Sequence, residues 1–131
     1  MYGQSSQEFL VSLQIIMGIS VLFFWLAYFV RKKNKKLHVW MAASGVLSNL
    51  AGAVYLVVQV HYFGLSLYSP YSGILTVSHR IFATVITLMM FFMAFTGISG
   101  RKNLHVNVHK YFLIGYTITY ISGIILFRAT V

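Results

Sequence analysis

Four long apolar runs, separated by short gaps, constrain the fold of this chain more than any other feature. They cover about residues 9–30, 39–60, 74–98 and 111–127, and the last is the shortest. A helix needs roughly 20 apolar residues to cross a hydrocarbon core about 30 Å thick. The runs are continuous rather than alternating in polarity, which disfavours strands. The sequence therefore predicts four membrane-spanning helices.

The low charge content also favours a membrane protein. Charged residues make up 8% of the chain, whereas soluble domains carry about 25%. Because the chain has 131 residues, we expect a single domain over its whole length. The predicted fold class is all-α, an integral membrane four-helix bundle. The chain has no cysteine, which excludes disulfides, thiolate metal sites, iron–sulfur clusters and c-type haem attachment.

The distribution of basic residues predicts how the chain is oriented. The net charge of +9 comes from ten Lys and Arg residues against one acid, Glu8. Two gaps between the apolar runs hold most of the basic residues: Arg31, Lys32, Lys33, Lys35 and Lys36 in the first, and Arg101, Lys102 and Lys110 in the third. Since basic loops stay in the cytoplasm, both termini are predicted to lie outside a prokaryotic cytoplasmic membrane. Topology and attraction to anionic lipid then account for the charge, and nucleic acid is not an expected partner.

Small residues recur every four positions in two of the runs. They are Ser44, Ser48 and Gly52 in the second, and Gly115, Thr119 and Gly123 in the fourth. Such residues let helix backbones approach closely, so the pattern predicts helix–helix contact; a flat cofactor lying against bare backbone is the alternative. Asn49, in the middle of the second run, is expected to face other helices because its amide needs partners.

All five histidines lie where the apolar runs begin or end. His38, His105 and His109 fall on the predicted inner side, and His61 and His79 on the outer side. Each group draws on two different helices. Two neutral imidazoles facing each other can coordinate haem iron from both sides of the porphyrin. The pattern therefore predicts one or two haem b groups.

The expected haem ligands are His61 with His79 outside, and His38 with His105 or His109 inside. Arg80 adjoins His79 and is expected to bind a haem propionate or, alternatively, a lipid phosphate. Candidates for the same role on the inner side are Lys36, Arg101 and Lys110.

Two other interpretations of the histidines stay open at this point. Histidine is semi-polar, so each ring could simply lie in the headgroup zone. His105 and His109 are four residues apart, a helical spacing at which two imidazoles bind copper or zinc, with His38 as a third ligand. Glu8 is the one carboxylate side chain and no nucleophile–base motif is evident, so independent catalytic activity is not expected.

Several stretches of the chain form a recognisable pattern: "HVWMAASGVLSNLAGAVYLVVQVHY", "VSHRIFAT", a second basic loop with histidines, and "YISGIILF". In these stretches the chain resembles a small four-helix membrane family of YozB/CtaM type, a domain of unknown function. The resemblance covers about residues 30–127. His38, His61 and His79 match the family's histidine positions, and either His105 or His109 matches the fourth. The family's Pro-aromatic stretch in the last helix is missing here.

The resemblance implies a role in the maturation of haem–copper terminal oxidases, with haem or copper handling. The histidine pattern and the resemblance together lead to three expected functions. The first is a bis-histidine, b-type redox protein of a respiratory chain, and the second an oxidase assembly factor that holds haem or copper. The third is a cofactor-free structural subunit of a larger membrane complex. Lipid and other membrane subunits are the expected partners.

Overall fold

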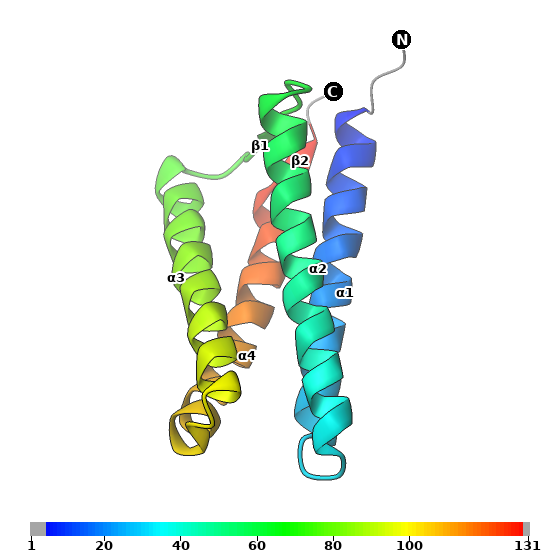
Figure 1. The fold of residues 1–131 in the computed structure, drawn as a ribbon. Helices are drawn as coiled ribbons and strands as arrows, with labels where there is room; N and C mark the ends of the chain where they lie inside the picture. The colour runs from blue at the N-terminus through cyan, green and yellow to red at the C-terminus, as the bar shows by residue number, and fades with distance from the viewer. Residues whose placement is uncertain (1–4, 130–131) are drawn as a thin grey trace. The chain divides into compact units, whose positions relative to one another are not determined.

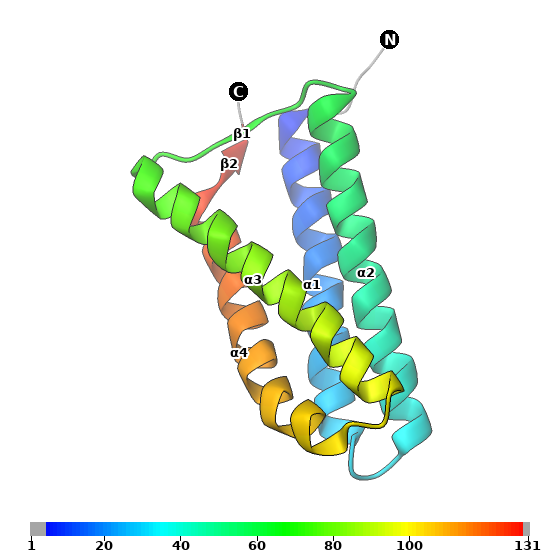
Figure 2. The same cartoon turned by 60° about the vertical axis from the view of Figure 1, so that its left-hand side comes forward.

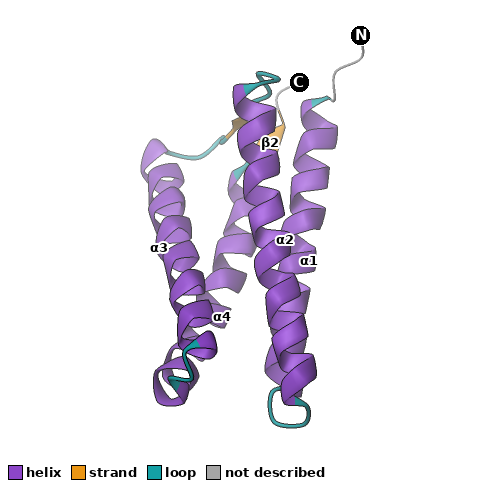
Figure 3. Cartoon of the chain, in the orientation of Figure 1, coloured by secondary structure: helices purple, strands orange, loops and turns teal. Residues whose placement is uncertain are grey.

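Four long helices make up most of the chain. The structure, a computed structural model, describes residues 5–129. The helices are α1 (Ser6–Val30), α2 (Lys35–His61), α3 (Gly73–Ile98) and α4 (Lys102–Leu126), with the short strands β1 (Leu67–Tyr68) and β2 (Arg128–Ala129) (Figure 1). Figure 3 shows how little of the described chain is strand or loop. The predicted all-α, four-helix fold class is confirmed. The predicted single domain includes residues 1–4 and 130–131, which lie outside the described residues.

The chain divides into two compact units. One contains α1, α2 and both strands, and the other contains α3 and α4. Each unit is a helical hairpin whose two helices run side by side in opposite directions (Figures 1 and 2). The turns are short, which is the usual connection between antiparallel neighbours.

Three helices are long and apolar enough to cross a membrane. The mean hydropathy of the most apolar stretch is 2.3 in α1, 1.7 in α2 and 2.2 in α3. Large apolar side chains are exposed along all the helices, up to 89% for Ile98, and lipid is the solvent that suits such faces. The chain is therefore a small, multi-pass helical membrane protein. Helix α4 starts earlier than predicted, at Lys102, and is not among these three helices, so the fourth span stays a prediction.

Side-chain caps explain where the first three helices begin. Ser5 and Glu8 form a capping box at α1, with the Glu8 carboxylate accepting from the Ser5 N–H at 3.1 Å. Asn34 accepts from the Leu37 N–H at α2, and Ser72 caps α3 in the same way. Such caps satisfy amides that a helix leaves without partners.

A left-handed glycine ends α3 and starts the turn to α4. Gly100 has a φ of 73°, which glycine adopts at little cost. The Arg101 N–H donates to the Thr96 carbonyl at 3.0 Å, the bond expected when a Schellman motif closes a helix. Lys102 then opens α4. The turn between α3 and α4 is thereby only a few residues long.

Two glycines on α2 form its close contact with α1. A Cβ at position 45 would lie 2.8 Å from the ring of Phe24, and one at position 52 would lie 2.7 Å from Met17. The buried Ser20 hydroxyl donates to the Gly45 carbonyl at 2.7 Å. Helix contact at Gly52 is as predicted, whereas Gly45 was not among the predicted residues.

The polar residues of this second run behave in two ways. The Ser44 hydroxyl bonds its own helix, at the Trp40 carbonyl. Asn49 is only 6% exposed, which confirms the prediction that its amide faces other protein groups. The side chains of Phe24 and Met17 occupy the space in front of Gly45 and Gly52, so helix packing, rather than a flat cofactor, explains these glycines.

Two glycines on α4 face α3. A Cβ at position 115 would collide with Ile86, and one at position 123 would lie 3.5 Å from the His79 ring. The Thr119 hydroxyl bonds its own helix at Gly115. The predicted small-residue contact of the fourth run is therefore present, with Gly115 and Gly123 as its contact points.

A two-stranded pairing was not predicted. Strand β1 pairs antiparallel with β2, with Leu67 opposite Ala129 and Tyr68 opposite Arg128. Each strand has two residues, so periodicity could not reveal them.

Candidate functional site

Every histidine directs its Nδ1 atom to an oxygen atom within hydrogen-bonding distance. Three of the rings reach the other helix of their own hairpin: His38, His79 and His105. The rings of His61 and His109 bond carbonyl groups of their own helices. The first three are held by tertiary structure and form the better-ordered candidates for a binding site.

His79 is anchored to α4. Its Nδ1 lies 2.8 Å from the hydroxyl oxygen of Ser122. That hydroxyl donates its single proton to the Thr119 carbonyl at 3.0 Å. A hydroxyl that donates to this carbonyl accepts from the imidazole, and the proton of a neutral ring then lies on Nδ1. The His79 Nε2 then carries the lone pair that a metal ion requires.

His105 is anchored to α3 in the same way. Its Nδ1 lies 3.1 Å from the Met93 carbonyl and 3.3 Å from the Thr96 hydroxyl. The Thr96 hydroxyl donates to the same carbonyl at 3.0 Å, and its residue is 1% exposed. Both oxygen atoms act as acceptors, so Nδ1 is again the protonated nitrogen.

His38 is anchored to α1. Its Nδ1–H donates to the backbone carbonyl of Ala27 at 2.8 Å. Since a carbonyl can only accept, the lone pair of the neutral ring lies on Nε2. Along α2, His38 is seven residues from Gly45 and fourteen from Gly52, which places all three on the side that faces α1.

His61 and His109 each bond a carbonyl group of their own helix through Nδ1. His61 is exposed and its Nδ1–H donates to the Val57 carbonyl at 3.1 Å. The ring of His109 bonds the Val106 carbonyl. It also lies parallel to the ring of His105, with 6.4 Å between the ring centroids and 12° between the planes. The predicted proximity of His105 and His109 on one helix is thus present.

The hydrogen bonding of the rings is compatible with metal binding. Metal-binding histidines usually donate one ring N–H to a carbonyl, carboxylate or water and coordinate through the other nitrogen. Four of the rings meet the first half of this description with a backbone carbonyl, and His79 has a serine hydroxyl in that place. The donor set of neutral imidazoles therefore fits haem iron, whose axial ligand in many proteins is histidine.

His79 and His105 lie at opposite ends of the α3–α4 hairpin. Thr96, which contacts His105, is 17 residues after His79 on α3, or about 26 Å along the helix. That length approaches the thickness of a hydrocarbon core. The hairpin thus presents one anchored imidazole near each end of a membrane-sized span.

The predicted pairings between histidines join the two units of the chain. His38 and His61 belong to the first unit, and His79, His105 and His109 to the second. The pairing of His61 with His79, and of His38 with an inner histidine, therefore stays a prediction. Among residues 5–129, no three His, Asp or Glu side chains come together as a metal site. Copper bound by the three inner histidines stays a prediction as well.

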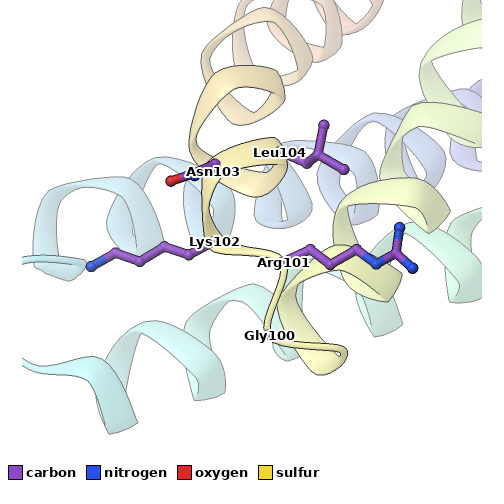
Figure 4. A pocket seen from close by; sticks show the side chains of 5 residues that line it. All are labelled: Gly100, Arg101, Lys102, Asn103 and Leu104. Carbon is purple, nitrogen blue, oxygen red and sulfur yellow. The ribbon is translucent and has the colours of Figure 1, made fainter.

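Arg80 is exposed on the surface of α3. It lines a shallow hollow of about 260 Å³ together with Ile81, Thr84 and Val85. A second hollow, of about 290 Å³, lies at the α3–α4 turn and includes Arg101 and Lys102, whose side chains extend in opposite directions (Figure 4). Both hollows are open and carry cationic groups, so either can contact the phosphate of a lipid or a carboxylate group.

Comparisons of the chain with models of protein families, with curated protein sequences and with solved structures find no match. The resemblance to the YozB/CtaM type therefore stays a prediction, carried by the positions of the histidines and the basic loops. The fold and the geometry of the hairpins stand independently of it.

Three functional candidates were missed from the sequence: Ser122 and Thr96 as partners of the imidazoles, and Gly97 beside His105. A signal for them exists. His79 precedes the Thr96–Gly97 pair, and His105 precedes the Ser122–Gly123 pair, by the same 17 residues. In an antiparallel hairpin this repeat brings each histidine opposite the other helix's hydroxyl–glycine pair.

Proposed function

We propose that the chain is a small bis-histidine haem protein of b type that transfers electrons within a prokaryotic cytoplasmic membrane. The observation that carries the proposal is the hydrogen bonding of the imidazoles. The rings of His79 and His105 are each hydrogen-bonded through Nδ1 to an oxygen atom of the neighbouring helix. This arrangement leaves Nε2 as the coordinating nitrogen of each neutral ring.

The principal ligands in this proposal are His79 at one end of the α3–α4 hairpin and His105 at the other. The second ligands are those the sequence predicts: His61 for His79, and His38 for His105, with His109 as the alternative to His105. Because the hairpin has one such histidine at each end, the proposal predicts two haem groups. Bound haem supplies one-electron chemistry, and the protein sets its potential through the ligands and their hydrogen bonds.

Cationic groups near each end support the binding of haem propionates. Arg80 follows His79 directly, and Arg101 and Lys102 lie at the turn beside the start of α4. Most basic residues of both hairpins lie at or near the turns, such as Arg31 and Lys33 in the first. By the positive-inside tendency, we propose that both turns face the cytoplasm and that both termini lie outside.

An assembly function is the second candidate. The resemblance to the YozB/CtaM type favours a protein that holds haem or copper during the maturation of a terminal oxidase. The same imidazoles would serve, and other membrane subunits would be its partners. The third candidate is a structural subunit without a cofactor. His38, His79 and His105 each join two helices, and polar side chains stabilise helix contacts in membranes.

A reduced-minus-oxidised absorption spectrum of the purified chain separates these functions. The proposal predicts a sharp b-type band that is lost when His79 or His105 is replaced by alanine. Colourless protein that co-purifies with an oxidase would favour the assembly function. Colourless protein that remains stably bound in another membrane complex would favour the structural one.

A further inference from the structure

The α3–α4 hairpin holds two imidazoles by the same local arrangement, once at each end. Ser122 and Thr96 each donate a hydroxyl proton to the backbone carbonyl three residues earlier, at 3.0 Å in both cases. Each hydroxyl oxygen then accepts from a histidine of the other helix, His79 at 2.8 Å and His105 at 3.3 Å. A hydroxyl that has already donated cannot act as a donor to the ring.

A glycine follows each hydroxyl residue and makes room for the ring. A Cβ at position 123 would lie 3.5 Å from Cε1 of His79, which is ordinary contact. A Cβ at position 97 would lie 3.3 Å from Cε1 of His105, which is tighter than usual. The Cε1 atom of each ring therefore lies close to a glycine of the neighbouring helix, and the closer approach is that of His105 to Gly97.

The repeat has a simple geometric basis. The pair of His79 with Ser122 and the pair of Thr96 with His105 are both centred on the same point of the chain, between Gly100 and Arg101. The two ends of the hairpin are thus related by an approximate twofold exchange of helices. An arrangement that appears twice, in reversed order, is harder to attribute to a single incidental hydrogen bond.

We propose that Ser122 and Thr96 are positioning residues, which fix the Nδ1-protonated tautomer of His79 and His105 and so direct each Nε2 lone pair toward iron. The role toward iron rests on the proposed haem function, whereas the tautomer is a property of the chain alone. The two positions differ in one respect. His105 also donates to the Met93 carbonyl at 3.1 Å, so it keeps an acceptor when the Thr96 hydroxyl is removed.

The test is nuclear magnetic resonance of the full chain with ¹⁵N-labelled histidine, in lipid nanodiscs prepared without haem. The spectra are recorded at a pH of about 8.5, well above the usual pKa of a free histidine side chain of about 6.5. The wild-type spectrum should show a protonated Nδ1 and an unprotonated Nε2 for both rings. Ser122→Ala should lower the ratio of the Nδ1-protonated to the Nε2-protonated tautomer at His79 by roughly 5-fold, the value of one hydrogen bond.

Matched variants make the outcome specific. Ser122→Thr keeps the hydroxyl and should retain the wild-type tautomer. Thr96→Val, which keeps the side-chain shape, should change the ratio at His105 less than Ser122→Ala changes it at His79. Thr87→Val should change neither ring, because the Thr87 hydroxyl donates to the Ala83 carbonyl of its own helix.

Two results would overturn the inference: a protonated Nε2 at His79 in the wild type, or a tautomer ratio that Ser122→Ala leaves unchanged. A different failure would concern the haem function alone. If the tautomers respond as expected but added hemin binds neither ring, the haem proposal is wrong and the hydroxyl groups still set the tautomers.

Discussion

The Nδ1 atom of His79 lies 2.8 Å from the hydroxyl oxygen of Ser122, 43 residues later in the chain. This contact gives the imidazole two roles. It joins α3 to α4, and in the proposed function it fixes the tautomer in which Nε2 coordinates haem iron. A hydrogen bond between membrane helices contributes about 0.6 kcal/mol on average, so the hairpin should tolerate its loss. The two roles can therefore be separated by substitution.

Replacement of His79 by glutamine should separate them. The glutamine amide can still donate to Ser122, but it is a far poorer ligand for haem iron than imidazole is. We expect haem binding at this end to be lost while the helix content, followed by circular dichroism, stays at the wild-type level. Loss of both would indicate that His79 is needed for folding. Retention of full haem binding would exclude His79 as a ligand.

The close contact of α1 with α2 should be sensitive to a single methyl group at Gly45. Its Cβ would lie 2.8 Å from the Phe24 ring, and overpacking a buried contact costs about 1–3 kcal/mol. Alanine recovers up to roughly 1 kcal/mol of this through its helix propensity. Gly45→Ala should therefore lower the midpoint of thermal unfolding in detergent, and adding Phe24→Leu should restore part of it.

Gly73 provides the control for that experiment. It is the first residue of α3, and a Cβ there meets no atom within 4 Å. Gly73→Ala should leave the midpoint unchanged or raise it slightly. An equal loss of stability in both variants would mean that contact with Phe24 is not the cause.

The proposed orientation can be measured because the chain has no cysteine. Single cysteines at Lys33 and Ser69 would report on the first turn and on the loop between α2 and α3. A thiol reagent that does not cross membranes should label the Ser69→Cys chain in intact cells. The Lys33→Cys chain should be labelled only after the cells are opened. The reverse pattern would show that the basic turns lie outside.

The sequence predicted the helices well because long apolar runs and capping residues are local signals. Helix α4 extends upstream of the predicted fourth span, because the polar segment from Lys102 to Lys110 is helical but too polar to be recognised as part of a membrane span. The expected contact through Ser44 fell on Gly45, one position away, because four-residue spacing does not say which face of a helix is buried. Such a choice depends on the partner helix.

The candidate site was predicted only in part. Histidine positions at the ends of the runs were visible, and three of the five rings are anchored between helices. The hydroxyl groups of Ser122 and Thr96 were not recognised, because their role depends on the register of two antiparallel helices. The spacing from His79 to Thr96 equals that from His105 to Ser122, which is consistent with that register. The spacing can be interpreted in this way only once the two helices are known to form an antiparallel hairpin.

The most direct test of the account is the number of haem groups bound per chain when hemin is added to the purified protein in lipid. We predict two for the wild type, one for His79→Ala, one for His105→Ala and none for the double variant. Ser44→Ala, which removes a hydroxyl that bonds its own helix at Trp40, should bind two. A wild-type chain that binds no haem, or a double variant that binds as much as the wild type, would contradict the account.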